Sequence, residues 1–583
     1  MHNKIQLHLI QRWLQLAVVL LVSSAQATPL KAQTVPPILV PPPRPETAPL
    51  PTPSPLPPAN NLLQPSTLPT PGVETRTPTV PGTITVTQFR FTGNTAFSSK
   101  RLAQVLAGFT DRPIAFADLF RARTALAEFY NNKGYITSGA LLPRQTFQGG
   151  VVSIQVVEGK LEAIKVTGVR RLNRNYVLER LRLATSKPLN RNRLLEALQL
   201  LRLNPLIKNI SANLTAGSRP NTTVLEVQVT EAKTFSSQII LDNNRPTSVG
   251  SFERGVQLNH ANLLGFGDSL SVGYTNTDGT DNVNALYTVP FNPRNGTFSF
   301  GYGATWSHVI VTPFNRLNIN VNYRFYDLAV RQPVFQSPNG EFALGVTLSR
   351  RESNASFLGS PFYGQLITAG ADNRGRTRIS SIRFFQEWTK RNSRSVLAAR
   401  SQFSLGVGAI DATIHRTGLD SRFFSWQGQG QWARLLAPDT LLVVRGDIQL
   451  ASRPLVPLEQ FGLGGIETVR GYPEYFLLTD NAVSGSVELR LPIFRAEGAV
   501  LQIAPFADVG HGWDILGSRD REKSSNTSNN SNTLLSVGLG LRLQLGNNLT
   551  ARFDWGHPLI NNSFTKRSWQ ENGLYFSVQF NPF

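Results

Sequence analysis

The sequence predicts two small α+β domains followed by an all-β transmembrane barrel of about 16 antiparallel strands. Three observations lead to this prediction. A unit of roughly 75 residues with helical and extended patterns occurs twice. From Phe235 onward, apolar and polar residues alternate through one segment after another. Short and long connections between these segments also alternate, as they do in barrels of the outer membrane.

Residues 1–27 are predicted to be a signal peptide. Lys4 and Arg12 flank the start of an apolar run, Leu14–Val22, and Ala25-Gln26-Ala27 places small residues at a cleavage site. A retained membrane anchor is the alternative, but this run is too short to span a bilayer comfortably. No later segment offers a long enough apolar run, so a chain that crosses a membrane would do so as a β-barrel.

Residues 28–83 are predicted to be a proline-rich linker. The segment includes Pro41-Pro42-Pro43 and Pro57-Pro58. Proline has no backbone N–H and does not fit the interior of a helix or a sheet. We therefore expect a semi-extended polyproline linker.

The duplicated unit spans residues 84–159 and 160–232. Phe89–Asn94 opens the first copy and Ile164–Val169 opens the second, and both openings contain Thr-Gly. Each copy ends in an alternating segment that closes with glutamate. Between these ends lie helical patterns at Ser99–Leu106, Ala117–Asn131, Asn175–Leu183 and Arg191–Leu201. The order β-α-α-β-β predicts two similar α+β domains, and a simple spacer domain is the alternative interpretation.

Residues 233–583 are predicted to form the barrel. Leu535 to Leu545 is apolar at every second position, while the positions between carry Ser, Gly, Arg and Gln. Apolar and polar residues would also alternate in the strands of a soluble β-sandwich, so the lengths of the connections distinguish the two folds. Short links at 265–267, 292–295, 337–340, 390–392, 437–439, 495–498 and 546–548 alternate with mostly longer ones. Short periplasmic turns and longer external loops are typical of outer-membrane barrels.

Composition excludes several classes of function. The 583 residues have a formal charge of +21, but the basic residues are scattered, so we expect no nucleic-acid binding. The chain has no cysteine, which excludes disulfides and thiolate metal sites. Neither a phosphate-binding Gly-x4-Gly-Lys loop nor His-Glu-x-x-His or Gly-x-Ser-x-Gly occurs. We therefore expect no enzyme activity, no cofactor and no metal.

The stretch from 452 to 510 contains the candidate functional site. Val469-Arg470-Gly471-Tyr472 lies on a long Gly-rich loop, and Phe506, Asp508 and Gly510 share the polar face of a later strand. A lone carboxylate on that face needs a partner, and Arg470 is the obvious candidate. The simpler interpretation is a solvated arginine and an Asp-x-Gly turn.

The loop at 453–482 is too long to stand in solvent without structure or a docking place. We expect it to fold back into the barrel and to bring Arg470 against Asp508. Gly471 would then allow a tight turn, and Tyr472 would pack near Phe506. In a wet lumen, breaking the pair should cost about 1–2 kcal/mol.

Two such units, a barrel, Val-Arg-Gly-Tyr and Phe-x-Asp-x-Gly together resemble the two-partner secretion transporters, the haemolysin secretion/activation family. The duplicated unit resembles the POTRA (polypeptide-transport-associated) domain. In the first unit Pro143, Gln145, Glu158 and Gly159 resemble the haemolysin-secretor type. At the other end Gly573, Phe576, Val578 and Phe583 resemble the signal read by the barrel-assembly machinery. Some members place an N-terminal helix in the barrel as a plug, and the prolines of 28–80 argue against such a helix here.

The resemblance implies a monomeric pore in the cell outer membrane, surrounded by its lipid, with the POTRA domains in the periplasm. It implies that these domains capture an unfolded, β-rich exoprotein with an N-terminal secretion domain, by adding a strand to a sheet edge. It also implies porin activity, and transport driven by folding outside the cell. An outer-membrane insertase of the same superfamily is the alternative, although insertases of this kind usually carry three or more POTRA domains. A plain porin would need neither the duplicated unit nor the loop motif.

Overall fold

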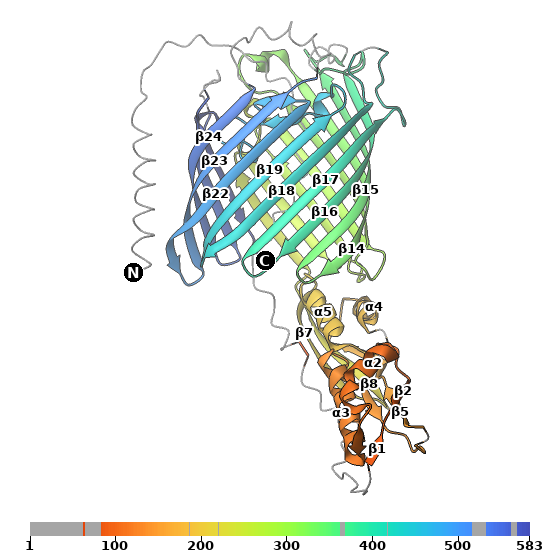
Figure 1. Ribbon diagram of the computed structural model, residues 1–583. Helices are drawn as coiled ribbons and strands as arrows, with labels where there is room; N and C mark the ends of the chain where they lie inside the picture. The colour runs from red at the N-terminus through yellow and green to blue at the C-terminus, as the bar shows by residue number, and fades with distance from the viewer. Residues whose placement is uncertain are drawn as a thin grey trace.

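The computed structural model describes residues 62–63, 83–147, 149–185, 187–219, 221–361, 368–416, 418–515, 532–560 and 568–582. The predicted signal peptide, all of the predicted linker except residues 62, 63 and 83, and Phe583 lie outside these ranges. The described residues form two small α+β units in line below a barrel (Figure 1). None of the helices in these ranges has both the length and the apolar composition of a membrane-spanning helix.

The two units share one topology, as the duplication predicted. The first contains β1 (Thr83–Thr85), β2 (Gln88–Thr92), α2 (Ser99–Val105), β3 (Pro113–Ala115), α3 (Phe116–Asn132), β4 (Gly139–Leu141) and β5 (Val151–Val157). The second contains β6 (Lys160–Thr167), α4 (Arg174–Ala184), α5 (Arg191–Arg202), β7 (Ile207–Ala216) and β8 (Thr222–Glu231). The sheet orders β2-β5-β4 and β6-β8-β7 are equivalent, and the first strand runs parallel to the last in both. The first unit adds the short β1–β3 pair to the predicted order.

Both units need the glycine of their Thr-Gly opening. Gly93 and Gly168 have φ of +79° and +85°, and a Cβ on them would lie 2.4 Å and 2.1 Å from the carbonyl oxygens of Val156 and Val229. Only glycine permits this close approach between the turn and the last strand. The same local chemistry therefore shapes both units.

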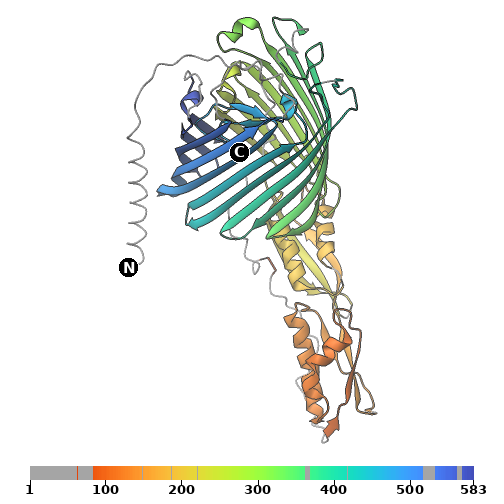
Figure 2. The same ribbon diagram turned by 45° about the horizontal axis from the view of Figure 1, so that its top comes forward.

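Hydrogen bonds join the two units to each other and to the barrel. At the first junction the Arg191 N–H donates to the carbonyl oxygen of Gly134 at 2.8 Å. At the second, the Asn173 N–H donates to the carbonyl oxygen of Gly265 at 2.7 Å, and Arg180 Nε donates to Asn295 Oδ1 at 2.9 Å. Gly265 and Asn295 belong to two of the predicted short turns. The short turns are thus at the end of the barrel that faces the units (Figure 2).

Sixteen strands of the described residues close into one antiparallel barrel, confirming the predicted fold class. They are β9 (Phe235–Asp242), β10 (Glu253–Ala261), β11 (Ser269–Asn276), β12 (Thr280–Pro290), β13 (Thr297–His308), β14 (Asn320–Ser337), β15 (Gly340–Ser356), β16 (Arg376–Arg391), β17 (Ser395–Val407), β18 (Phe423–Ala437), β19 (Thr440–Ala451), β22 (Asn481–Ala496), β23 (Ala499–Trp513), β24 (Thr533–Leu545), β25 (Leu549–Pro558) and β26 (Leu574–Phe580). The barrel closes where β26 pairs with β9, from Ser577↔Asp242 to Phe580↔Ile239.

The barrel is apolar outside and polar inside. On β24, Leu539 is 43% exposed and Ser536 is fully buried, and the neighbouring residues follow the same alternation. Exposed leucines beside buried serines reverse the arrangement of a soluble protein, so the outer face suits lipid. The inward face of β22 to β25 carries the charged side chains of the candidate site.

Candidate functional site

The loop between β19 and β22 folds into the barrel instead of standing in solvent. It contains a short 3₁₀ turn, Pro457–Glu459, and a two-stranded hairpin of β20 (Phe461–Leu463) and β21 (Leu477–Thr479). Its apolar residues Leu463, Val469 and Tyr472 are fully buried in a cluster with Ala482 and Leu534. We call residues 452–480 the lumen loop.

Arg470 at the tip of the lumen loop grips Asp508 on β23. Arg470 Nε donates to Asp508 Oδ2 at 2.8 Å, and Nη2 donates to Oδ1 at 2.9 Å. The Arg470 backbone N–H also donates to Oδ2, at 3.1 Å. Two parallel bonds from a planar guanidinium fix both distance and orientation. Ser486 on β22 donates to Asp508 Oδ1 at 2.7 Å and holds the carboxylate from its other side.

Each residue of the Phe-x-Asp-x-Gly sequence contacts the loop. The Arg470 guanidinium carbon lies 3.3 Å from the centre of the Phe506 ring, which is a cation–π contact. A Cβ on Gly510 would lie 2.8 Å from Val469 Cγ2 and 3.0 Å from Leu463 Cδ2, so glycine makes room for the loop. The spacing of two residues puts all three on the lumen face of β23.

Arg470 also contacts two carboxylates that the sequence analysis missed. Its Nη1 lies 2.7 Å from Glu488 on β22 and 3.3 Å from Asp554 on β25. Arg542 on β24 bridges the same two carboxylates, at 2.8 Å and 2.7 Å. Arg490 pairs with Glu488, and Arg552 pairs with Asp554. We call these residues the lumen ion network: Arg470, Glu488, Arg490, Asp508, Arg542, Arg552 and Asp554. A charged residue at an inward position of a strand is the sequence signal that could have found them: Glu488 lies on β22, next to β23, and Asp554 lies one strand further away, on β25.

The Arg470–Asp508 pair is buried, which corrects the expectation of a pair in a wet lumen. The side chains of Arg470 and Asp508 are 3% and 1% exposed. The loop itself excludes water from the charges that hold it. Breaking the pair should therefore cost roughly 3–5 kcal/mol, the range for buried pairs, and not the smaller value of an exposed one.

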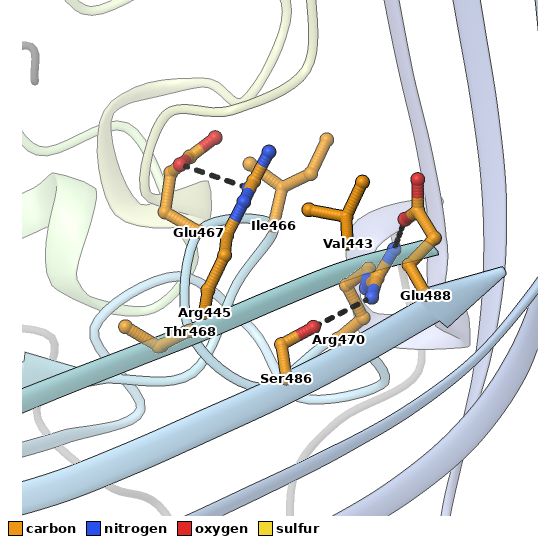
Figure 3. A pocket seen from close by; sticks show the side chains of 8 residues that line it. All are labelled: Val443, Arg445, Ile466, Glu467, Thr468, Arg470, Ser486 and Glu488. Atoms are coloured by element: carbon orange, nitrogen blue, oxygen red, sulfur yellow. Dashed lines mark hydrogen bonds and ion pairs between the residues drawn. The ribbon is translucent and has the colours of Figure 1, made fainter. Parts of the chain in front are cut away.

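Beside Arg470 the loop leaves only a cavity of about 10 Å³, enough for roughly one water molecule. Figure 3 shows its lining, including Arg445 and Glu467, whose charged groups are 3.9 Å apart, and Arg470 between Ser486 and Glu488. A space of this size holds no organic ligand. The arrangement is suited to holding a loop in place.

Gly471 and Tyr472 connect the loop to the last strands of the barrel. Gly471 has φ of +95°, and a Cβ there would lie 3.1 Å from the Gly556 carbonyl carbon on β25. The Gly471 N–H donates to Tyr575 Oη at 3.0 Å, and Tyr575 Oη donates to the Tyr472 carbonyl oxygen at 2.6 Å. Tyr575 on β26 thus bridges the backbone of the motif.

Tyr472 has surroundings different from those expected. Its ring packs against Phe476, with centroids 5.8 Å apart. Its hydroxyl lies 2.9 Å and 3.1 Å from the carbonyl oxygens of Ile560 and Leu535. The face of Phe506, where we expected Tyr472, is occupied by the guanidinium of Arg470, because the tight turn at Gly471 sends the tyrosine toward β24.

The C-terminal residues separate into two places. Gly573 lies at the loop: its φ is +76°, and a Cβ there would lie 2.1 Å from the Gly556 carbonyl oxygen. Phe576 instead packs with Phe252 and Trp569. Val578 pairs with Leu241 where the barrel closes.

A second anchor holds the other end of the lumen loop. Glu459 Oε1 lies 2.7 Å from Arg383 on β16 and 3.2 Å from Arg351 on β15. Leu455, Val456 and Leu458 pack beside it against Tyr323, Ile379 and Phe423. The loop is therefore tied to β14–β16 and β18 at one end and to β22–β26 at the other, and it crosses the lumen between them. No local signal in the sequence marked Glu459.

The residues singled out in the first unit hold that unit together. Gln145 exchanges two hydrogen bonds with the Ser153 backbone on β5, at 2.7 Å and 2.8 Å, and also contacts the Pro143 carbonyl oxygen at 3.4 Å. The Gly159 carbonyl oxygen accepts a bond from the Leu189 N–H, at the junction with the second unit.

Glu158 closes the first unit through its carboxylate. Oε1 accepts bonds from the N–H groups of Thr95 and Ala96, both at 2.8 Å, and from Tyr130 Oη at 3.0 Å. Partial burial alone would raise the pKa of Glu158, but these donors outweigh it and lower the pKa below its ordinary value. Glu231 accepts three N–H bonds in the same way from residues 170–172 in the second unit.

The family described as haemolysin secretion/activation protein ShlB/FhaC/HecB matches residues 221–543, more than half of the 583 residues. The family described as POTRA domain, ShlB-type, matches residues 84–159.

Curated relatives include the heme/hemopexin transporter protein HuxB of Haemophilus influenzae, which is 22% identical over 79% of this chain and 81% of its own length. The outer membrane transporter CdiB of Escherichia coli is 22% identical over 84% of this chain and 82% of its own length.

Among solved structures, CdiB from Escherichia coli has a TM-score of 0.65 at 18% identity and covers 88% of this chain and 93% of its own. CdiB from Acinetobacter baumannii has a TM-score of 0.60 at 17% identity and covers 99% and 98%. BamA from Haemophilus ducreyi, in a form lacking its POTRA domains 1–3, has a TM-score of 0.52 at 13% identity and covers 85% and 100%. These structures share the fold of a barrel with POTRA domains.

Proposed function

This chain belongs to the haemolysin secretion/activation protein family and is an outer-membrane two-partner secretion transporter, and we propose that its lumen loop closes the pore at rest. Its barrel lies in the outer membrane and its POTRA domains lie in the periplasm. The family is one of secretion channels.

The observation that supports the closing role most is the buried grip of Arg470 on Asp508. The loop crosses the lumen and is fixed at two ends, by Arg470 in the lumen ion network and by Glu459 between two arginines. A polypeptide in extended form needs that space. Release of one end, with the other acting as a hinge, would clear the lumen without disturbing the closed hydrogen-bond ladder of the barrel.

We also propose Val469, Arg470, Gly471, Tyr472, Phe506, Asp508 and Gly510 as the residues of the lock. Pro143, Gln145, Glu158 and Gly159 would act by shaping the first POTRA domain. Gly573, Phe576, Val578 and Phe583 would be read by the barrel-assembly machinery during biogenesis. Gly573 has a second use, because its lack of a side chain also lets the loop and β25 approach each other.

The transported partner is proposed to be a β-rich exoprotein with an N-terminal secretion domain, captured in the periplasm in unfolded form. A monomer would suffice, because one chain closes one barrel. Folding of the exoprotein outside the cell would drive transport, without enzyme activity of the transporter. We also propose the domain division stated above: a signal peptide at 1–27, a linker at 28–83, POTRA domains at 84–159 and 160–232, and the barrel at 233–583.

An insertase function is the second candidate, since BamA shares the fold. No observation favours it specifically: two POTRA-type units are present in the described residues, and both match the arrangement expected of a secretion transporter. The decisive experiment is single-channel recording of the wild type and of Arg470→Ala in planar bilayers. The proposal expects a larger or more often open channel in the variant, and an unchanged conductance trace would contradict it.

A further inference from the structure

Three basic side chains lie together at the end of the barrel that faces the POTRA domains. Lys390 lies near the end of β16, Arg394 lies in the short turn between β16 and β17, and Arg434 lies near the end of β18. The three strands are neighbours in the barrel (Figure 1). All three side chains are exposed. We call Lys390, Arg394 and Arg434 the basic rim.

The basic rim belongs to the outer surface of the barrel and not to the lumen. On β16 the outer positions lead to Lys390 in steps of two, through Ile382, Phe384, Gln386 and Trp388. On β18, Arg434 shares its face with exposed Phe424, while Ala433 on the other face is buried. Because successive side chains of a strand point to opposite faces, Lys390 and Arg434 lie on the face that contacts lipid.

The basic rim also lies at the depth of the lipid headgroups. The outer face of β16 changes from polar to apolar at Ser380, whose Oγ accepts a bond from Arg350 at 3.0 Å, and becomes charged again at Lys390. With a rise of about 3.3 Å per residue and a strand tilt of about 40°, the distance from Ser380 to Lys390 corresponds to a height of about 25 Å. This is the height of the apolar band of an outer-membrane barrel. Lys390 therefore marks the periplasmic boundary of that band.

Two tryptophans lie just inside this boundary. Trp388 precedes Lys390 by two positions on the outer face of β16, and Trp432 precedes Arg434 in the same way on β18. The guanidinium carbon of Arg434 lies 5.9 Å from the centre of the Trp432 ring. Tryptophan is enriched where the acyl chains meet the headgroups, so each cation stands above an interfacial ring.

The basic rim has no counter-ion in the part of the chain that the structure describes. None of its three side chains forms a salt bridge with a described residue. Arg495, at the same end of the barrel on β22, is different, because it pairs with Asp439 at 2.8 Å. Three cations without a carboxylate partner, side by side on a lipid-facing surface, are complementary to an anion at the membrane boundary.

The pairing of the strands sets the width of the cluster. Lys390 pairs with Leu397 on β17, which pairs with Trp432, and Arg434 pairs with Ser395. Neighbouring strands are about 4.8 Å apart, so the backbones of β16 and β18 are about 10 Å apart across β17. Long lysine and arginine side chains can reach a single phosphate group from both sides of such a span.

We propose that the basic rim, with Trp388 and Trp432, binds the headgroup of an anionic phospholipid in the periplasmic leaflet of the outer membrane. The ammonium and guanidinium groups donate charge-assisted hydrogen bonds to the phosphate oxygens, and the tryptophans contact the apolar part of the lipid. A zwitterionic phospholipid carries the same phosphate, but its own cation is repelled by the cluster. The site lies outside the barrel and is separate from the lumen loop.

The test uses tryptophan quenching by a brominated lipid. The full-length protein is reconstituted in phosphatidylcholine vesicles that contain a minor fraction of phosphatidylglycerol with brominated acyl chains, which quench tryptophans that they touch. The first variant removes the charges, with Lys390→Gln, Arg394→Gln and Arg434→Gln, and a second keeps them, with Lys390→Arg, Arg394→Lys and Arg434→Lys. The matched control removes three exposed charges of the first POTRA domain, with Lys100→Gln, Arg112→Gln and Lys133→Gln.

We expect phosphatidylglycerol to be enriched at least tenfold over phosphatidylcholine at the basic rim of the wild type, because each basic residue near the headgroups contributes about a factor of five. The charge-keeping variant and the POTRA control should retain the enrichment, and the charge-free variant should lose it. Trp388→Phe combined with Trp432→Phe should remove the extra quenching. High salt should weaken the enrichment in the wild type, since it screens exposed charges. Glycerol phosphate in the buffer should not reverse it, because it lacks acyl chains.

Equal quenching of the wild type and the charge-free variant would overturn the inference, and so would quenching that persists after both tryptophans are replaced. Reversal by glycerol phosphate would show a site for small anions in place of a lipid site. Enrichment that high salt leaves unchanged would count against it without any variant. Heat-modifiable gel mobility checks that each variant is an assembled barrel.

Discussion

Replacing Arg470 by alanine should release the tip of the lumen loop and leave the barrel assembled. The substitution removes the bonds to Asp508, Glu488 and Asp554 at once and leaves Asp508 buried with Ser486 as its remaining side-chain partner among those described. Losing a buried partner costs roughly 3–5 kcal/mol. Because 1.4 kcal/mol corresponds to a factor of ten, the docked state should become roughly 10²- to 4 × 10³-fold less favoured.

Asp508→Ala should have a smaller effect than Arg470→Ala. It leaves Arg470 paired with Glu488 and Asp554, so only part of the network is lost. The loss of the buried hydrogen bonds to Asp508 should destabilise the docked loop by about 1–3 kcal/mol. The double variant should resemble Arg470→Ala, since residues of one ion network are not additive. Arg470→Lys keeps the charge but loses the bidentate hydrogen bonds to Asp508, and its channel opening should lie between those of the wild type and Arg470→Ala.

The assay is single-channel conductance, with heat-modifiable gel mobility as the control for barrel assembly. Arg445→Ala is the matched control, because Arg445 lines the same small cavity and its charged group lies 3.9 Å from Glu467. It should leave conductance near wild type. An Arg445→Ala channel that opens as much as the Arg470→Ala channel would show that the grip of Arg470 does not hold the loop. Strictly additive effects of the substitutions at 470 and 508 on channel opening would show the same.

The other predictions concern separate parts of the molecule. Glu459→Gln should loosen the second anchor and raise the frequency of channel openings, whereas the same change at exposed Glu467 should not; equal traces would count against a two-ended loop. The pKa of Glu158 is lowered on folding, so its stabilising contribution is present above the ordinary glutamate pKa of 4.5 and is lost as pH falls through the folded value. Amide protection at Thr95 and Ala96, measured as the exchange rate relative to the intrinsic rate at the same pH, should therefore fall in acid in the wild type, and Glu158→Gln should abolish this dependence. Gly573→Ala should impair assembly or loop docking, because its Cβ would lie 2.1 Å from the Gly556 carbonyl oxygen, and normal folding and conductance together would contradict this. Deleting residues 84–159 should stop secretion of the partner while the barrel still reaches the membrane, and undiminished secretion would exclude a capture role for this domain.

The elements of this protein and their inward and outward faces could be predicted from residue spacing and local motifs. Alternation needs only the period of two of a strand, so it placed Phe506, Asp508 and Gly510 on one face of β23. The duplication was visible in the two Thr-Gly openings and the two closing glutamates. Each motif has a local role: the glycine lets the turn approach the last strand, and the glutamate accepts hydrogen bonds from backbone N–H groups. Arg470 could be predicted as the partner of Asp508 from two features: a single carboxylate on the polar face of a strand, and an arginine on the long Gly-rich loop before it.

Which lumen charges meet depends on the folded barrel. Glu488 and Asp554 lie 18 and 84 residues from Arg470, on strands β22 and β25. Alternation says that such residues point inward, but the stagger of neighbouring strands sets which of them lie at the same height in the barrel. The second anchor at Glu459 depends on the same stagger, through β15 and β16. The burial of the Arg470–Asp508 pair also depends on the folded barrel. The loop that Arg470 holds is the segment that excludes water from the pair, and no local sequence pattern contains that information.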